Sequence, residues 1–72
     1  MSYTFSAIVE KEGKWYVALC PELDVASQGK TIETALASLK EAVELFVEHA
    51  SRKELKAALS SRPLMTTLEV TV

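Results

Sequence analysis

Hydrophobic residues recur at steps of three or four between Thr31 and Ala50, the longest patterned stretch of the chain. At 3.6 residues per turn, this spacing places them along one stripe of an α-helix. The opposite side is polar and rich in glutamate, so the helix can bury only one side and must lie on an outer surface. Leu45 alone breaks the pattern, on the polar side. The stripe consists of Ile32, Ala35, Leu36, Leu39, Ala42, Val43, Phe46, Val47 and Ala50.

Three shorter stretches ahead of this helix have the character of β-strands. Tyr3–Val9 alternates between apolar and polar positions, which predicts a half-buried strand. The polar run Lys11–Lys14 contains a glycine and predicts a short hairpin into a second, antiparallel strand at Trp15–Cys20. Val25–Gln28 is short, and we interpret it as a third strand.

The residues before the long helix are those expected at a helix start. Gly29 can supply a positive φ, and Thr31 can accept a hydrogen bond from a first-turn amide as the N-cap. The third residue after this cap is Thr34 instead of Glu, so the sequence predicts an incomplete capping box.

Two further elements follow the long helix. Ser51–Glu54 fits the capping-box pattern, so we expect the long helix to end near His49 or Ala50 and a second helix to begin at Ser51. Leu64–Val72 alternates again and predicts a fourth strand near a sheet edge, where unpaired amides invite a second copy. The order β-β-β-α-(α)-β predicts an α+β fold, a two-layer α/β sandwich.

Length and composition favour one small domain over residues 1–72. With 72 residues, 49% hydrophobic and 25% charged, the chain has no room for a second module. Because a core of this size adds little stability, we expect a homo-oligomer, either a dimer or a tetramer. The single cysteine, Cys20, excludes an internal disulfide and is interpreted as a buried thiol. No apolar run approaches a membrane span, so we expect a cytoplasmic protein.

Charge is unevenly distributed around the net value of −2. The segment Ser51–Arg62 has a local charge of +3, from the four cations Arg52, Lys53, Lys56 and Arg62 and the one anion Glu54. The rest of the chain therefore carries −5. These cations could contact phosphates, but the segment lacks interleaved aromatic residues and a groove-reading motif, so a solvated face is the better interpretation.

Three glutamates, Glu41, Glu44 and Glu48, share one side of the long helix in its later half, where the macrodipole disfavours anions. They form either a solubilising surface or an acidic patch for a basic partner.

No set of residues marks a catalytic centre. His49 near the helix end is better explained as a favourable C-terminal cation than as a base. One cysteine and one histidine cannot build a tetrahedral zinc site, and two glycines cannot form a phosphate-binding loop. We therefore expect no enzyme activity, no metal and no cofactor.

The run Tyr16–Glu48 resembles the N-terminal domain of HicB-like antitoxins. The matching features are Cys20-Pro21-Glu22-Leu23, Gln28-Gly29, Thr31, Ala35 and the amphipathic segment Lys40–Phe46, whereas Thr34 stands where the family usually has Glu. The resemblance implies a partial ribonuclease-H-like fold, with a three-stranded meander, a packed helix and a fourth strand parallel to the first. It does not imply nuclease activity, because Ser6-Ala7 occupies the middle of the first strand where acids would be needed.

The resemblance also implies a role. HicB-like antitoxins mask a small HicA toxin that cleaves messenger RNA, and the full-length proteins add a C-terminal DNA-binding domain that we do not expect in a chain ending at Val72. The leading hypothesis is a non-enzymatic antitoxin, and the alternatives are a small nucleic-acid-binding domain, an orphan oligomeric fold, and metal-dependent RNA hydrolysis. Candidate partner contacts are Glu22, Asp24, Glu41, Glu44 and Glu48, and candidate oligomer contacts are Leu45, Leu68 and Val70.

Overall fold

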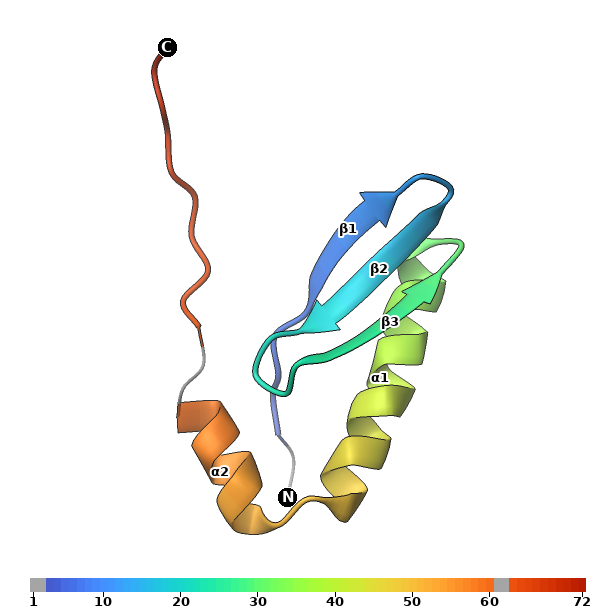
Figure 1. Cartoon of the computed structure of the whole chain (residues 1–72), viewed down its shortest axis with the longest axis vertical. Coiled ribbons are helices and arrows are strands. Elements are labelled where there is room, and N and C mark those ends of the chain that lie inside the picture. Colours follow the sequence, from blue (N-terminus) through green and yellow to red (C-terminus); the bar gives the residue numbers. More distant parts are fainter. Residues whose placement is uncertain (1–2, 61–62) are drawn as a thin grey trace.

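A three-stranded antiparallel sheet packed against one long helix forms the body of the molecule (Figure 1). The structure is a computed structural model that describes residues 3–60 and 63–72. A second, shorter helix follows the long one and turns back beside the N-terminal residues (Figure 1). The elements are β1 (Ile8–Glu12), β2 (Trp15–Cys20), β3 (Val25–Gly29), α1 (Ile32–His49) and α2 (Arg52–Ser60).

The strands form a meander in the order β1-β2-β3, as the sequence predicts. Glu12 pairs with Trp15 across a tight hairpin, in which Gly13 adopts a φ of 61°. On the other side of β2, Cys20 pairs with Val25. Gly13 therefore occupies the left-handed region that glycine enters without steric cost.

The core lies between β2 and α1. Ala18 and Cys20 from the strand and Ala35 and Leu39 from the helix are the buried residues of this cluster. The predictions of a buried Cys20 thiol and of an outer, one-sided helix are confirmed. The small size of three of these four side chains lets the helix axis approach the sheet closely.

The first strand begins later than the alternation predicts. Tyr3 to Ala7 are extended but outside the sheet, and pairing starts where Ile8 faces Leu19. Continuing this register would place Ser6 opposite Pro21, which has no N–H to donate to the ladder. The Ser6 amide instead donates a hydrogen bond of 2.9 Å to the Glu22 carboxylate.

The N-cap at Thr31 is confirmed, but the expectation of an incomplete capping box is wrong. The Thr34 amide donates to Thr31 Oγ1 at 3.1 Å, and the Thr31 amide donates to Thr34 Oγ1 at 2.9 Å. The threonine hydroxyl can accept this hydrogen bond in place of the usual glutamate carboxylate. The first turn of α1 is thus held reciprocally at both residues.

Gly29 serves a different purpose from the expected one. It does not have a positive φ, but a Cβ built on it would meet Thr34 Oγ1 and lie 2.5 Å from the Ala35 amide nitrogen. Contacts this short are sterically forbidden, so the missing side chain is what allows β3 to touch the first turn of α1.

The helix boundaries agree with the sequence signals. α1 ends at His49, and the Ala50 amide donates to the Val47 carbonyl at 3.3 Å. Ser51 caps α2, because its hydroxyl accepts a hydrogen bond of 3.1 Å from the Glu54 amide. Leu55 is the buried residue of this short helix.

The expected fourth strand is not formed within one chain. Residues 63–72 are extended and exposed, and they run away from the body without joining the sheet (Figure 1). A strand requires a hydrogen-bonding neighbour, and none adjoins this segment. The fold is therefore a small α+β arrangement of three antiparallel strands on a helix, and the fourth strand of a ribonuclease-H-like sheet is not seen in the described residues.

Replacement of Gly29 by alanine tests the close contact between β3 and α1. The added Cβ must displace helix backbone, so we expect Gly29→Ala to lower the free energy of unfolding by about 1–3 kcal/mol, the usual cost of overpacking. Urea denaturation monitored by circular dichroism gives this difference.

Gly13 provides the matched control for that substitution. Its Cβ would meet nothing within 4 Å, so only the positive φ opposes a side chain. Asparagine tolerates this conformation, and Gly13→Asn should change stability by less than about 1 kcal/mol. An equal loss of stability in both variants would contradict the steric role of Gly29.

Candidate functional site

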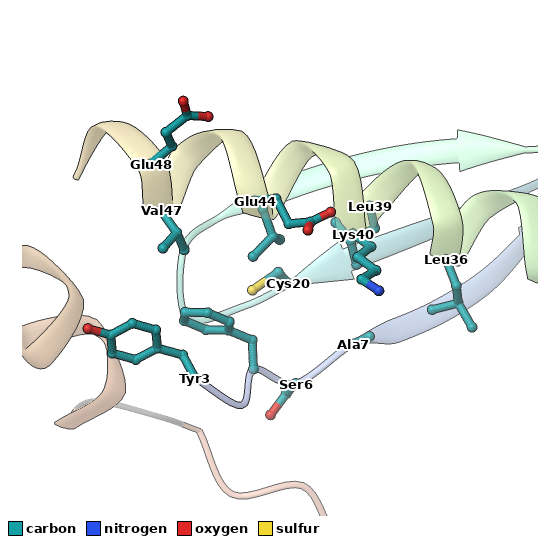
Figure 2. A pocket seen from close by; sticks show the side chains of 12 residues that line it. Tyr3, Ser6, Ala7, Cys20, Leu36, Leu39, Lys40, Glu44, Val47 and Glu48 are labelled. Atoms are coloured by element: carbon teal, nitrogen blue, oxygen red, sulfur yellow. The ribbon is translucent and has the colours of Figure 1, made fainter. Parts of the chain in front are cut away.

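An open groove runs between the N-terminal residues and the flank of α1 (Figure 2). Its volume is about 750 Å³, and its lining is mainly apolar. Leu36 and Val47 reach from the helix toward the N-terminal segment, whereas Glu48 points away (Figure 2). We call this feature the α1 groove and define it by Phe5, Ala7, Leu36, Val43 and Val47.

The groove follows directly from helical spacing. Leu36, Val43 and Val47 are separated by seven and four residues, so they share the side of α1 next to its buried stripe. The sheet beneath is too narrow to cover this side, since the buried residues of the main core cluster come from β2 and α1 and none from β1. Part of the apolar stripe that the sequence predicts as buried therefore lines an open groove.

A hydrogen-bonded triad closes the inner end of the groove. The Glu22 carboxylate accepts from the Ser6 amide at 2.9 Å, and the Cys20 thiol donates to the same oxygen at 3.5 Å. Partial burial opposes ionisation of Glu22, but the hydrogen bonds that its carboxylate accepts from Ser6, from its own backbone amide and from Cys20 together lower the pKa of this carboxyl. Glu22 therefore anchors the N-terminal segment as a carboxylate.

Cys20 lies at the floor of this end of the groove. Desolvation by burial raises the pKa of its thiol, and the adjacent Glu22 carboxylate adds to the effect. A thiol that stays protonated is a poor nucleophile, so its surroundings suit a packing role.

The two acidic residues of the β2–β3 turn lie in different environments. Glu22 faces inward as described, whereas Asp24 is exposed and holds the turn with a φ of 53°. Aspartate tolerates this left-handed conformation better than most residues. The sequence analysis named both residues as candidate partner contacts. It missed the anchoring role of Glu22 because Ser6, the donor of this hydrogen bond, lies 16 residues away in the chain, and such a distant pair leaves no local sequence pattern.

The three glutamates of the expected acidic patch are all exposed on α1. Glu44 and Glu48 also lie at the rim of the α1 groove, together with Lys40, and Glu41 lies farther around the helix. The three therefore form a continuous strip along the outside of the helix, which we call the acidic strip. It borders an apolar surface on one side.

Leu45 is not the isolated residue that its sequence position indicates. It is 58% exposed and lies in a shallow hollow with Phe46, which is 38% exposed, and with Val25 and Ala42. The helical pattern assigned Phe46 to the buried stripe, so the neighbouring apolar surface around Leu45 was not predicted. The other two expected oligomer contacts, Leu68 and Val70, are exposed in residues 63–72.

The basic residues of α2 are only partly gathered. Arg52 and Lys56 lie one turn apart and line a hollow with Tyr3 and Leu59, and Lys53 is exposed. Arg62, the fourth residue of the expected basic cluster, lies outside the described residues.

Within residues 3–60 and 63–72, no group of three or more potential metal-ligating side chains comes together. In the same part of the chain, neither helix combines the length and apolarity needed to cross a bilayer.

The described residues form a small α+β fold with an exposed, mainly apolar groove along α1. The chain belongs to the UPF0150 family. It is 33% identical over 66 residues to a UPF0150 protein of Helicobacter pylori (strain J99), covering 90% of this chain and 92% of that protein. It is 48% identical over 50 residues to a UPF0150 protein of Synechocystis, covering 67% and 69%. No family model and no solved structure matches the chain.

The anchoring bond of Glu22 predicts a pH-dependent stability. Because its pKa is lower in the folded than in the unfolded chain, the stabilisation is complete above the unfolded pKa of about 4.3 and is lost as pH falls through the folded value. Glu22→Gln should lower the free energy of unfolding by about 1 kcal/mol at pH 7 and flatten its acid dependence.

Asp24→Asn is the control, since it neutralises a neighbouring exposed carboxylate and keeps a side chain that tolerates the left-handed backbone. Denaturation midpoints between pH 3 and 7 compare the two variants. An acid dependence in Glu22→Gln as steep as in the wild type would contradict the assignment.

Proposed function

We propose that this protein is a non-enzymatic, HicB-like binding protein that neutralises a small HicA-like, RNA-cleaving toxin by covering its surface. The resemblance of Tyr16–Glu48 to HicB-like antitoxins suggests the partner, and the acidic strip is the observation that carries the proposal. Under this proposal the fourth strand of a ribonuclease-H-like fold is completed by association.

The position of the acidic strip favours recognition over stability. Its members, Glu41, Glu44 and Glu48, lie in the later half of α1, where the helix dipole and their mutual repulsion oppose them. A protein that cleaves RNA must present a cationic surface to phosphates. A row of exposed carboxylates complements such a face in charge.

Charge complementarity would act mainly on association and specificity. Exposed carboxylates opposite a cationic surface accelerate the encounter of the two proteins and disfavour acidic competitors. Each ion pair at the edge of the interface contributes only about 0.2–1 kcal/mol to the binding free energy. Masking by direct contact then needs no chemistry from this chain.

The test is to look for a HicA-like reading frame beside this gene and to co-express the two proteins. Changing Glu41, Glu44 and Glu48 to glutamine should weaken the complex about tenfold at physiological salt, as three rim pairs imply, and should restore growth arrest. Calorimetry and a growth assay measure these effects.

The control changes Glu10, Glu12 and Glu33 to glutamine, which shifts the net charge equally at exposed positions outside the strip. If both triple variants weakened the complex equally, net charge and not the acidic strip would explain the effect. If the wild type formed no complex, the proposal would be overturned.

A second candidate is nucleic-acid binding through α2. It is favoured by the placement of Arg52 and Lys56 on one side of the helix beside the aromatic ring of Tyr3, an arrangement that suits a phosphate next to a stacked base. The affinity for a single-stranded oligonucleotide should then fall as salt rises. The double variant Arg52→Gln with Lys56→Gln should reduce the slope of log affinity against log salt concentration by an amount that corresponds to roughly two released counterions. Lys11→Gln with Lys14→Gln, which removes two exposed cations of the hairpin, is the control.

A further inference from the structure

We propose that residues 63–72 of a second copy of this chain add a strand beside β1 and seat their apolar side chains in the α1 groove, reciprocally in a dimer. This inference does not depend on the identity of any toxin. It rests on three features of the described residues: the exposed segment, the open edge of β1 and the groove.

The segment has the pattern of a strand with one buried face. Its alternate positions Leu68, Val70 and Val72 are apolar and exposed, whereas Thr67, Glu69 and Thr71 are polar. An amphipathic strand with no sheet beside it leaves both its apolar face and its backbone amides unsatisfied. Pairing with another sheet removes both costs.

The open edge that continues from β1 back through residues 3–7 is charged along only part of its length. β1 pairs with β2 on one side, and no described residue pairs with the other. Glu10, Lys11 and Glu12 carry charges that discourage strand addition there, but the stretch from Tyr3 to Val9 has none. The uncharged part that lines the α1 groove lies in residues 3–7, just before β1.

The segment is long enough to follow the groove. The nine residues Leu64–Val72 would span about 30 Å as a strand, and the part of α1 that lines the groove, from Leu36 to Glu48, spans about 18 Å. A strand beside β1 would lie under the flank of α1 that the three-stranded sheet leaves uncovered. Its apolar side chains would meet Leu36, Val43 and Val47, in the same way that β2 meets Ala35 and Leu39.

The course of the chain favours a second copy as the occupant. After α2, residues 63–72 run outward past the sheet and away from their own groove (Figure 1). Reciprocal exchange lets two such segments cover two edges and two grooves about one two-fold axis. It also enlarges the small core of a 72-residue domain.

The first experiment is the oligomeric state in solution, measured by sedimentation equilibrium on the full chain. We expect a dimer for the wild type and a folded monomer for Leu68→Glu with Val70→Glu, which charges the apolar face. Thr67→Glu with Thr71→Glu adds the same charge to the polar face and should remain dimeric. A monomeric wild type would overturn the proposal, as would dissociation by both double variants alike.

The second experiment identifies the occupant without charging the interface. One copy carries Leu36→Cys in the groove and the other Leu68→Cys in the segment, both at exposed positions, and Cys20 remains buried. After mixing, unfolding and refolding together, a short bismaleimide reagent should link the two chains into a covalent heterodimer. Wild-type chains, which have only Cys20, should stay unlinked.

A chain carrying both cysteines distinguishes the alternative. If the segment folds into its own groove, this doubly substituted chain becomes cross-linked internally at every protein concentration, and the mixed copies give no heterodimer. That result would overturn the second copy as occupant. Loss of a toxin complex, in contrast, would leave the dimer and the cross-link unchanged, so failure of the proposed function is separately visible.

Discussion

The position of α1 depends on the contact between Gly29 and the first turn of the helix. Because a Cβ at this site would overlap Thr34 and Ala35, only glycine lets β3 touch the helix backbone. Together with the small Ala18 and Ala35, this contact draws α1 toward β2 and β3. The flank of the helix on the β1 side is then left without a strand beneath it, and the α1 groove is the consequence.

A second constraint closes the inner end of that groove. Pro21 cannot extend the ladder with β1, so the backbone of residues 3–7 must find hydrogen bonds elsewhere. The Glu22 carboxylate accepts one from the Ser6 amide and another from the Cys20 thiol. Pro21, which ends β2, and Glu22, which anchors the N-terminal segment, therefore act together. As a result the N-terminal residues form one wall of the groove and do not extend β1.

Local patterns predicted the elements and most of their ends, because periodicity, turn glycines and caps are encoded within a few residues. The α1 limits, the Gly13 hairpin and the Ser51 cap follow from such signals. Features that depend on distant partners could not be found in this way. Three features are of this kind. Glu22 points inward because it binds the distant Ser6 amide, and Gly29 is required because the first turn of α1 packs on it. Residues 63–72 stay unpaired because no strand of the sheet lies next to them. The candidate site was predicted only as an acidic face, without its apolar neighbour.

The acidic strip and the α1 groove can serve different partners without competing. Glu44 and Glu48 line the rim of the groove, and Glu41 lies farther around α1, so a strand seated below the helix would leave this outer surface exposed. In a two-fold dimer each copy would then present one strip, and association would stiffen the helix flank beneath it. A partner recognised by the strip would be bound with two sites per dimer, and charge-changing substitutions in the strip would alter its affinity while leaving the dimer intact.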